Sequence, residues 1–231
     1  GHGGGVVVIE ASDWVILNGK VIANGGSHPT DFTANHASGG AGGSIFIRCR
    51  RFAATNAVVE ARGGNTASQA GASAGAGGRI SIQYDPECQA SGLVTGTRFS
   101  VAPGPWNSPG DMGTLYFTEP RFLEAENSMF SGQVVHATAW SVPALTITNS
   151  RIRFPSAGFR LSVTGDLVIA GPCAALELGG RVDLPSDFYR ADLFGVTSPV
   201  SLDVGGHLIL TNGGSLIVYA GITNSEVGPA G

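Results

Sequence analysis

Charge is scarce in this sequence. Only 13% of its 231 residues are Asp, Glu, Lys or Arg, about half the usual share. Acidic residues outnumber basic ones by 17 to 13, and Lys20 is the only lysine. The basic residues form no stripe, so we expect no nucleic-acid partner. Long apolar runs are also missing. Because no stretch approaches the roughly 20 residues that cross a bilayer, we expect no membrane span.

Cysteine is almost absent. Cys49, Cys88 and Cys173 form neither a disulfide framework nor the spacing of a zinc knuckle. Their disulfide state stays open, and a bridge between Cys49 and Cys88 would need a turn that brings them together. The sequence also lacks the lysine of a phosphate-binding loop, since Arg79 follows a glycine cluster where that loop has lysine. These glycines precede a strand rather than a helix, which argues against a nucleotide site.

Glycine, in contrast, is abundant. It supplies 36 residues, roughly twice the average share. Glycine clusters lead into aliphatic segments in "GHGGGVVVI", "GGAGGSIFI", "GAGGRISI" and, more weakly, "MGTLYF". The last glycine of each cluster gives the anchors Gly5, Gly43, Gly78 and Gly113, spaced 38, 35 and 35 residues apart. Self-similarity at a nearly fixed period indicates a repeat architecture.

Large apolar residues follow each anchor at the second and fourth positions. These two sets are Val7, Ile45, Ile80 and Leu115, and Ile9, Ile47, Ile82 and Phe117. A two-residue period with one constant apolar face predicts a β-strand. A second match, between "VIANGG" and "VEARGG", has the same offset of 38 residues as the first two anchors. That offset also aligns Trp14 with Phe52 and predicts stacked aromatic rings.

Repeats of this length cannot bury an apolar face alone, whereas a stack of repeats can. We therefore predict an all-β fold, a right-handed parallel β-helix (solenoid) with Gly-rich coil-to-coil turns and protruding polar loops. An antiparallel β-sandwich is the alternative, although sandwiches seldom keep an internal period. The glycines would either form corners with positive φ or run as extended strands packed against each other, and both readings stay open.

The second half of the chain has a different repeat pattern. Residues 161–178 match residues 202–219 at an offset of 41 and then 40 residues. We therefore expect Gly-rich coils over residues 1–119, a transition segment over residues 120–144 and a second repeat type over residues 145–231. The three parts would form one continuous solenoid.

The motif "GGAGGSIFIR…VVEARGG…GAGGRISIQY…GTLYF" resembles the uncharacterised Gly-rich β-helical repeats of very large extracellular and cell-surface proteins. The resemblance covers about residues 1–118. The later "TGDLVIAG" and "GGHLILTNGG" are similar to the generic repeats of secreted adhesins and polysaccharide-active proteins. The resemblance implies a secreted or cell-surface structural element, and it carries no catalytic motif.

Several side chains are candidates for binding. Trp106 lies in a polar loop, while Tyr116 and Phe46 share the expected outer face, so these three aromatic residues could contact sugar rings. We expect no cofactor. The alternative is a divalent metal ion in the loop "SHPTDFTANHA", held by His28, Asp31 and His36.

Taken together, the sequence predicts a non-catalytic extracellular β-solenoid with a structural or adhesive role. The chain starts inside an anchor and stops without an obvious cap, so we expect end-to-end pairing with itself or with flanking β-helix segments, as in a filament. Polysaccharide is a further expected partner. The alternative function is a polysaccharide-active lyase or glycoside hydrolase. Its candidate groups are Asp85 with Glu87, and Glu119, Glu124 and Glu126 around Arg121.

Overall fold

The computed structural model describes residues 1–28, 38–66, 73–105, 110–119, 123, 126–127, 130–179 and 199–219. Within these ranges the regular structure is β-strand without α-helix, and no helix there is long and apolar enough to cross a bilayer. All of the strand pairs run parallel. The predicted all-β class with parallel pairing is thus confirmed, and the antiparallel sandwich is wrong for this part of the chain.

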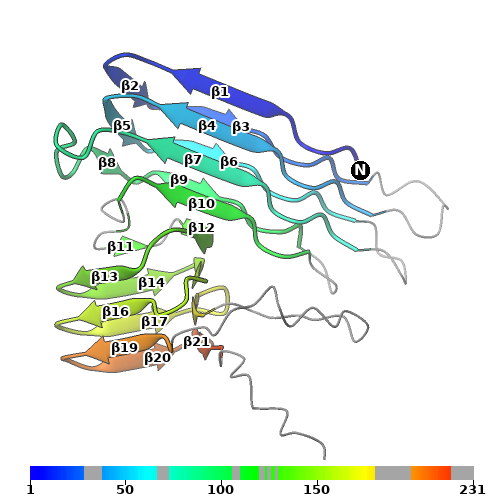
Figure 1. Ribbon diagram of the computed structural model, residues 1–231. Coiled ribbons are helices and arrows are strands. Elements are labelled where there is room, and N and C mark those ends of the chain that lie inside the picture. Colours follow the sequence, from blue (N-terminus) through cyan, green and yellow to red (C-terminus); the bar gives the residue numbers. More distant parts are fainter. Residues whose placement is uncertain are drawn as a thin grey trace, which may run out of the picture.

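In the first half, three consecutive strands form one tier, and successive tiers stack into three walls (Figure 1). The first wall contains β1 (Val6–Glu10), β4 (Ser44–Arg48), β7 (Arg79–Gln83) and β10 (Thr114–Phe117). The second contains β2 (Trp14–Leu17), β5 (Arg51–Thr55) and β8 (Val94–Thr95). The third contains β3 (Lys20–Ile22), β6 (Val58–Glu60) and β9 (Arg98–Ser100).

A single strand, β12 (Phe130–Val134), joins the two halves. Phe130 and Ser131 pair with β9, whereas Gln133 and Val134 pair with β10. The first and third walls therefore merge into one 11-stranded sheet, which continues through β15 (Arg151–Phe154), β18 (Ala175–Leu178) and β21 (Ser215–Val218). Beyond this junction the described strands belong to this sheet and to two smaller ones.

The other strands of the second half form two smaller sheets. One contains β11 (Glu126–Asn127), β14 (Leu145–Thr148), β17 (Leu167–Ala170) and β20 (Leu208–Thr211). The other contains β13 (Ala139–Val142), β16 (Arg160–Val163) and β19 (Ser201–Val204). Leu161 pairs with Leu202 and Leu176 with Leu216, so the predicted alignment of residues 161–178 with residues 202–219 is confirmed.

The predicted apolar column is also confirmed. Val7, Ile45, Ile80 and Leu115 are consecutive partners in the first wall. Paired residues of neighbouring strands lie about 4.8 Å apart, so these side chains stack directly on one another. Ile45, Ile80 and Leu115 are almost completely buried. The column therefore fills the space between the walls and holds successive tiers in register.

The predicted stacking of Trp14 on Phe52 is wrong. Trp14 pairs with Arg51, and Val15 pairs with Phe52. Phe52 is completely buried, whereas 37% of Trp14 is exposed and the guanidinium of Arg51 lies 4.5 Å from the centre of its ring. Three residues separate β1 from β2 but only two separate β4 from β5. The shift of one residue sends a strand side chain to the opposite face.

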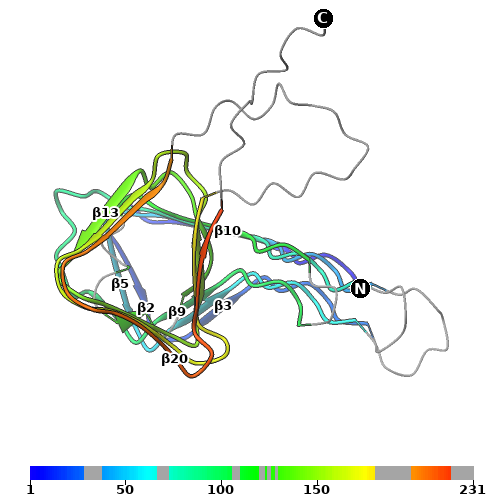
Figure 2. The same ribbon diagram turned by 90° about the horizontal axis from the view of Figure 1, so that it is seen from below.

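The glycine clusters form a second structure beside the walls, which we call the glycine arm. Its inbound segments, residues 1–5, 38–43, 73–78 and 110–113, precede the strands of the first wall. Its outbound segments, residues 23–28, 61–66 and 101–105, follow the strands of the third wall. Figure 2 shows both sets running side by side away from the walls.

Hydrogen bonds connect the arm in two directions. Within the inbound layer, Gly42 N donates to Ala76 O (2.9 Å). Between the layers, Gly40 N donates to Gly26 O (2.9 Å) and Gly43 N to Ala23 O (2.7 Å). Gly39 repeats the in-layer bond of Gly42, while the intervening Ala41 is exposed. This three-residue period is that of an extended polyproline-II helix.

Close backbone approach explains most of the described glycines of the arm. A Cβ atom placed on Gly43, Gly64 or Gly78 would lie well under 3.0 Å from a carbonyl oxygen of a neighbouring segment. None of the described arm glycines has positive φ. Of the two roles that the sequence left open, the extended packed segment is the one observed, and the clusters do not form tight coil-to-coil corners.

Candidate functional site

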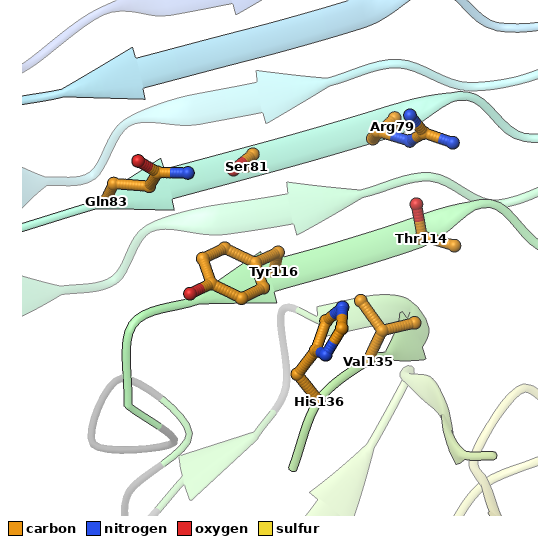
Figure 3. A pocket seen from close by; sticks show the side chains of 7 residues that line it. All are labelled: Arg79, Ser81, Gln83, Thr114, Tyr116, Val135 and His136. Carbon is orange, nitrogen blue, oxygen red and sulfur yellow. The ribbon is translucent and has the colours of Figure 1, made fainter. Parts of the chain in front are cut away.

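A pocket with a volume of about 500 Å³ opens on the outer face of the first wall (Figure 3). Its size falls within the usual range for small-molecule sites. It lies where β7 and β10 meet the segment that follows β12. Its lining consists of Arg79, Ser81, Gln83, Thr114, Tyr116, Val135 and His136.

Strand alternation creates the floor of this pocket. Ile80, Ile82 and Leu115 point inward and are completely buried. The residues between them therefore face outward. Thr114 pairs with Arg79, and Tyr116 pairs with Ser81. The floor thus places a cation beside a hydroxyl at one end and a phenol in the middle, with the amide of Gln83 at the other end (Figure 3).

One side of the pocket is formed by Val135 and His136, where the chain leaves the sheet after β12. Val135 N donates to Leu115 O (3.0 Å), which continues the pairing with β10 by one residue. His136 then takes φ = 65°, a left-handed conformation that is uncommon outside glycine. Its ring meets Tyr116 edge-on, with 5.6 Å between the ring centres. The turn therefore aims an imidazole at the floor of the pocket.

The electrostatic character of the pocket is basic. Arg79 is exposed at the first position of β7, and no ion pair joins it to another described residue. No Asp or Glu occurs among the described lining residues. Because the whole chain carries a formal charge of −4, this local excess of positive charge is a specific feature of the pocket.

The aromatic candidates have different positions. Tyr116 is half-buried in the pocket, so the structure places it in a cavity. Phe46 lies on the same outer face, paired with Ser81 from the next strand, but it is not part of the lining. Trp106 lies outside the described residues. Val135 and His136 were missed because they belong to residues 120–144, where no repeat could be detected.

Only one of the three proposed metal ligands, His28, belongs to the described residues. His28 belongs to the outbound layer of the glycine arm, where its N–H donates to Asn65 O (3.0 Å). Asp31 and His36 lie outside the described residues. Among the residues that are described, no cluster of three or more His, Cys, Asp or Glu side chains could hold a metal ion. The metal site of the loop remains a prediction.

The described candidate acids of the alternative enzyme, Asp85, Glu87 and Glu119, do not line the pocket. Asp85 shapes the turn after β7, where its carboxylate accepts hydrogen bonds from Glu87 N (3.0 Å) and the Cys88 thiol (3.2 Å). These bonds, the one from Cys88 above all, lower the pKa of Asp85. Glu119 O accepts a bond from the Tyr84 hydroxyl (3.2 Å). Arg121, Glu124 and the side chain of Glu126 are outside the described part.

All three cysteines are free thiols in the structure. Cys49 is buried, and this burial raises the pKa of its thiol. Cys88 lies nearer the surface, where Arg50 Nε donates to its sulfur (3.2 Å). The bridge between Cys49 and Cys88 that was left open is therefore not formed.

A buried charge cluster on β15 and β18 gave no signal in the sequence analysis. Arg153 and Glu177 are directly paired and almost completely buried. Arg153 Nε donates to Glu177 Oε2 (2.7 Å), and Arg151 Nε donates to Glu177 Oε1. Burial alone would raise the pKa of Glu177, but the bonds from the two arginines outweigh it and lower the pKa.

The same cluster connects distant parts of the chain. Arg153 Nη1 donates to Asp111 Oδ1 (3.1 Å), and Asp111 belongs to an inbound segment of the glycine arm. The Tyr219 hydroxyl donates to Glu177 Oε2 (2.9 Å). Burial and this bond raise the pKa of Tyr219. The cluster therefore fastens the arm to the second half of the stack, and its fully engaged carboxylate argues for a structural role.

Comparison with known proteins gives no relative on which a function could be based. No protein-family model matches the chain, and neither the curated proteins nor the solved structures contain a significant match. The function has to be argued from the geometry described above.

Proposed function

We propose that the chain is a right-handed parallel β-helix that serves as a structural or adhesive segment outside the cell. Its two ends would be extended by parallel strand pairing with a second copy or with a flanking β-helix segment. The proposed handedness rests on the strong general preference of parallel crossover connections. The extracellular location rests on the resemblance of the glycine repeats, and surface labelling of intact cells with an antibody against this segment tests it.

The observation that carries this proposal is the state of the two terminal tiers. Within the described residues, β1, β2 and β3 have a strand partner on one side only, and so do β19, β20 and β21. Leu208 and Leu210 are 47% and 48% exposed, although their partners Leu167 and Ile169 are completely buried. Unpaired strand edges beside uncovered core residues are a template for further pairing.

The two ends would associate by parallel strand pairing. Because every described strand pair is parallel, a copy added below β19–β21 in the same orientation would pair in parallel through its own β1–β3. Such a head-to-tail contact uses different surfaces on the two partners and does not close on itself, so it builds a filament. Each leucine covered in this way would gain about 1 kcal/mol or more of apolar burial.

Light scattering and electron microscopy over a range of concentrations test this proposal. We expect rods that lengthen with concentration. A double variant, Leu208→Asp with Leu210→Asp, should remain monomeric, because two inward-facing charges cannot be covered by another tier. Ile209→Asp is the matched control, since Ile209 points outward from the same strand. The proposal would be contradicted if the protein stayed monomeric at every concentration and the amides of β1 and β20 exchanged as slowly as those of β7. Such protection would mean that the strand edges at the two ends are covered.

A further inference from the structure

We propose that the pocket on β7 and β10 binds a carboxylate-bearing sugar, that is, a uronic acid residue of a polysaccharide. This inference adds a ligand site to the structural role, and it does not depend on end-to-end stacking. It rests on the chemistry of the lining, which combines one cation, one aromatic pair and a set of neutral hydrogen-bonding groups.

The scaffold of the pocket holds these groups in place. Arg79, Ser81 and Gln83 alternate with two isoleucines that are completely buried, and Thr114 and Tyr116 flank the equally buried Leu115. Each of the two strands is also paired on both sides over at least part of its length. Side chains on such a sheet need little reorganisation on binding, which reduces the entropic cost.

The cation selects the charge of the ligand. Arg79 has no carboxylate partner in the described part of the chain, and the described lining contains no acid that would neutralise it. A guanidinium presents a planar fork of donors that matches a carboxylate with two parallel hydrogen bonds. Thr114, the strand partner of Arg79, offers a hydroxyl next to it. This end of the pocket therefore suits an anion that is flat and has two acceptors.

The aromatic pair selects the body of the ligand. Tyr116 lies in the middle of the floor, and the ring of His136 contacts its ring edge-on. The exposed part of a phenol ring offers an apolar surface together with a polar hydroxyl. The C–H face of a pyranose can pack on that surface while its hydroxyl groups remain at the rim.

Two further lining residues suit hydroxyl groups. Ser81 pairs with Tyr116, and Gln83 lies two residues further along β7, so a hydroxyl lies beside the aromatic residue and an amide beyond it. Both can donate and accept hydrogen bonds, as sugar hydroxyls do. The distance from Arg79 to Gln83 along the strand is on the order of 13 Å. An inorganic anion would use only the Arg79 end, whereas an acidic sugar chain would use the whole length.

Calorimetric titration of the full chain tests this site, with tetragalacturonic acid and its fully methyl-esterified form as a matched pair of probes. The two probes share rings and linkages and differ in charge. We expect the acid to bind at least about tenfold more tightly than the ester. Equal affinity for the two probes, or no binding of the acid, would overturn the proposal. Tighter binding of sodium sulfate than of the acid would also overturn it, because it would indicate a site for small anions.

Variants separate the pocket from general charge attraction. Arg79→Gln should reduce the affinity for the acid to that for the ester, because it keeps the polar shape and removes the charge. Arg160→Gln is the control, since Arg160 is exposed at the first position of β16 and lies outside the pocket. It should leave the affinity unchanged. An equal loss in both variants would overturn the proposal.

A second variant tests the aromatic pair. Tyr116→Val should weaken binding of the acid and of the ester by a similar factor, about tenfold, because both probes would lose the ring contact. Thermal unfolding of each variant confirms that the sheet is intact before titration. Full affinity in a folded Tyr116→Val variant would overturn the role of the ring.

Discussion

Gly5, Gly43, Gly78 and Gly113 occupy the same position in successive tiers, yet their surroundings differ. A Cβ atom on Gly43 would collide with Gly5 O, and one on Gly78 would collide with Gly43 O. A Cβ atom on Gly5 would meet nothing within 4 Å, because none of the described segments lies against that face of Gly5. The need for glycine at this position therefore comes from the neighbouring tier rather than from the backbone conformation.

This contrast predicts two different outcomes for the same substitution. Gly78→Ala should lower the free energy of unfolding by roughly 3 kcal/mol, because two backbone segments must move apart. Gly5→Ala should change it by less than about 0.5 kcal/mol. Chemical denaturation of both variants measures the two values. Similar losses in both would show that the glycines serve conformational freedom rather than close approach.

Glu177 makes the stability of the chain depend on pH. Its folded-state pKa lies below the ordinary value of 4.5, so its contribution is present above that pH and is lost as the pH falls through the folded pKa. Glu177→Gln should lower the free energy of unfolding by about 3 kcal/mol at neutral pH, because Arg153 would stay buried without the carboxylate of Glu177. The difference in the free energy of unfolding between the variant and the wild type should become smaller as the pH falls below 4.5.

Urea denaturation of the wild type and of Glu177→Gln at neutral pH and at several acidic pH values measures this difference in unfolding free energy. Asp85 and Asp166 also have lowered pKa values, but both are present in the wild type and in the variant, so their effects cancel. A difference in unfolding free energy that stays constant with pH would mean that the pKa of Glu177 is not lowered in the folded protein.

Residue-scale prediction from the sequence worked where a side chain is large, apolar and periodic. The column from Val7 to Leu115 was found because each strand keeps the same spacing from its anchor glycine. Trp14 was misplaced because one extra residue in a turn has no visible signature in a single sequence, although it moves the side chain to the other face. His136 gave no signal, since its role depends on where β12 leaves the sheet.

At the scale of elements, β5 shows how one side chain can stand in for a strand. β8 pairs with β5 only at Ala54 and Thr55. Further along β5, the buried amide of Gln89 takes the place of a strand partner. Its Nε2 donates to Phe52 O (2.8 Å), and its Oε1 accepts from Phe52 N (2.9 Å). This exchange of two bonds imitates a short piece of a paired strand.

Removing that amide should loosen one edge of the second wall. Gln89→Leu should lower the free energy of unfolding by about 2 kcal/mol, because two buried backbone groups lose these bonds. The amide of Phe52 should also exchange with deuterium faster than in the wild type. Ser91→Ala, an exposed change in the same loop, is the control. Unchanged protection of Phe52 in Gln89→Leu would show that the amide is dispensable.

The glycine arm is the element that the sequence could place but not describe. The clusters were correctly located before each strand of the first wall, since glycine runs are easy to see. Their conformation depends on a partner layer that follows the third wall. The bonded residue of that layer lies between 11 residues earlier in the chain (Gly75 N to Gly64 O) and 20 residues earlier (Gly43 N to Ala23 O). Along the arm, the direction of the hydrogen bonds repeats every three residues. A run made mostly of glycine shows no such repeat in its sequence.

For the whole molecule, the internal period was the decisive sequence signal. It indicated stacked repeats and parallel pairing, and the described strands bear out both. It could not indicate the charged cluster of Arg153, Glu177 and Asp111, because that cluster joins the arm to strands of the second half. It also could not indicate the pocket, which lies where β7 and β10 meet the segment that follows β12.

The junction at β12 has a mechanical consequence. In a stack of this kind, the hydrogen bonds between tiers lie along the long axis, so tension on the ends loads each tier boundary in turn. β1 and β4 are paired at five positions, whereas β12 is paired with β9 at two and with β10 at two. Among the described tier boundaries, a pulled molecule would break first at this one, while the glycine-rich half stayed whole.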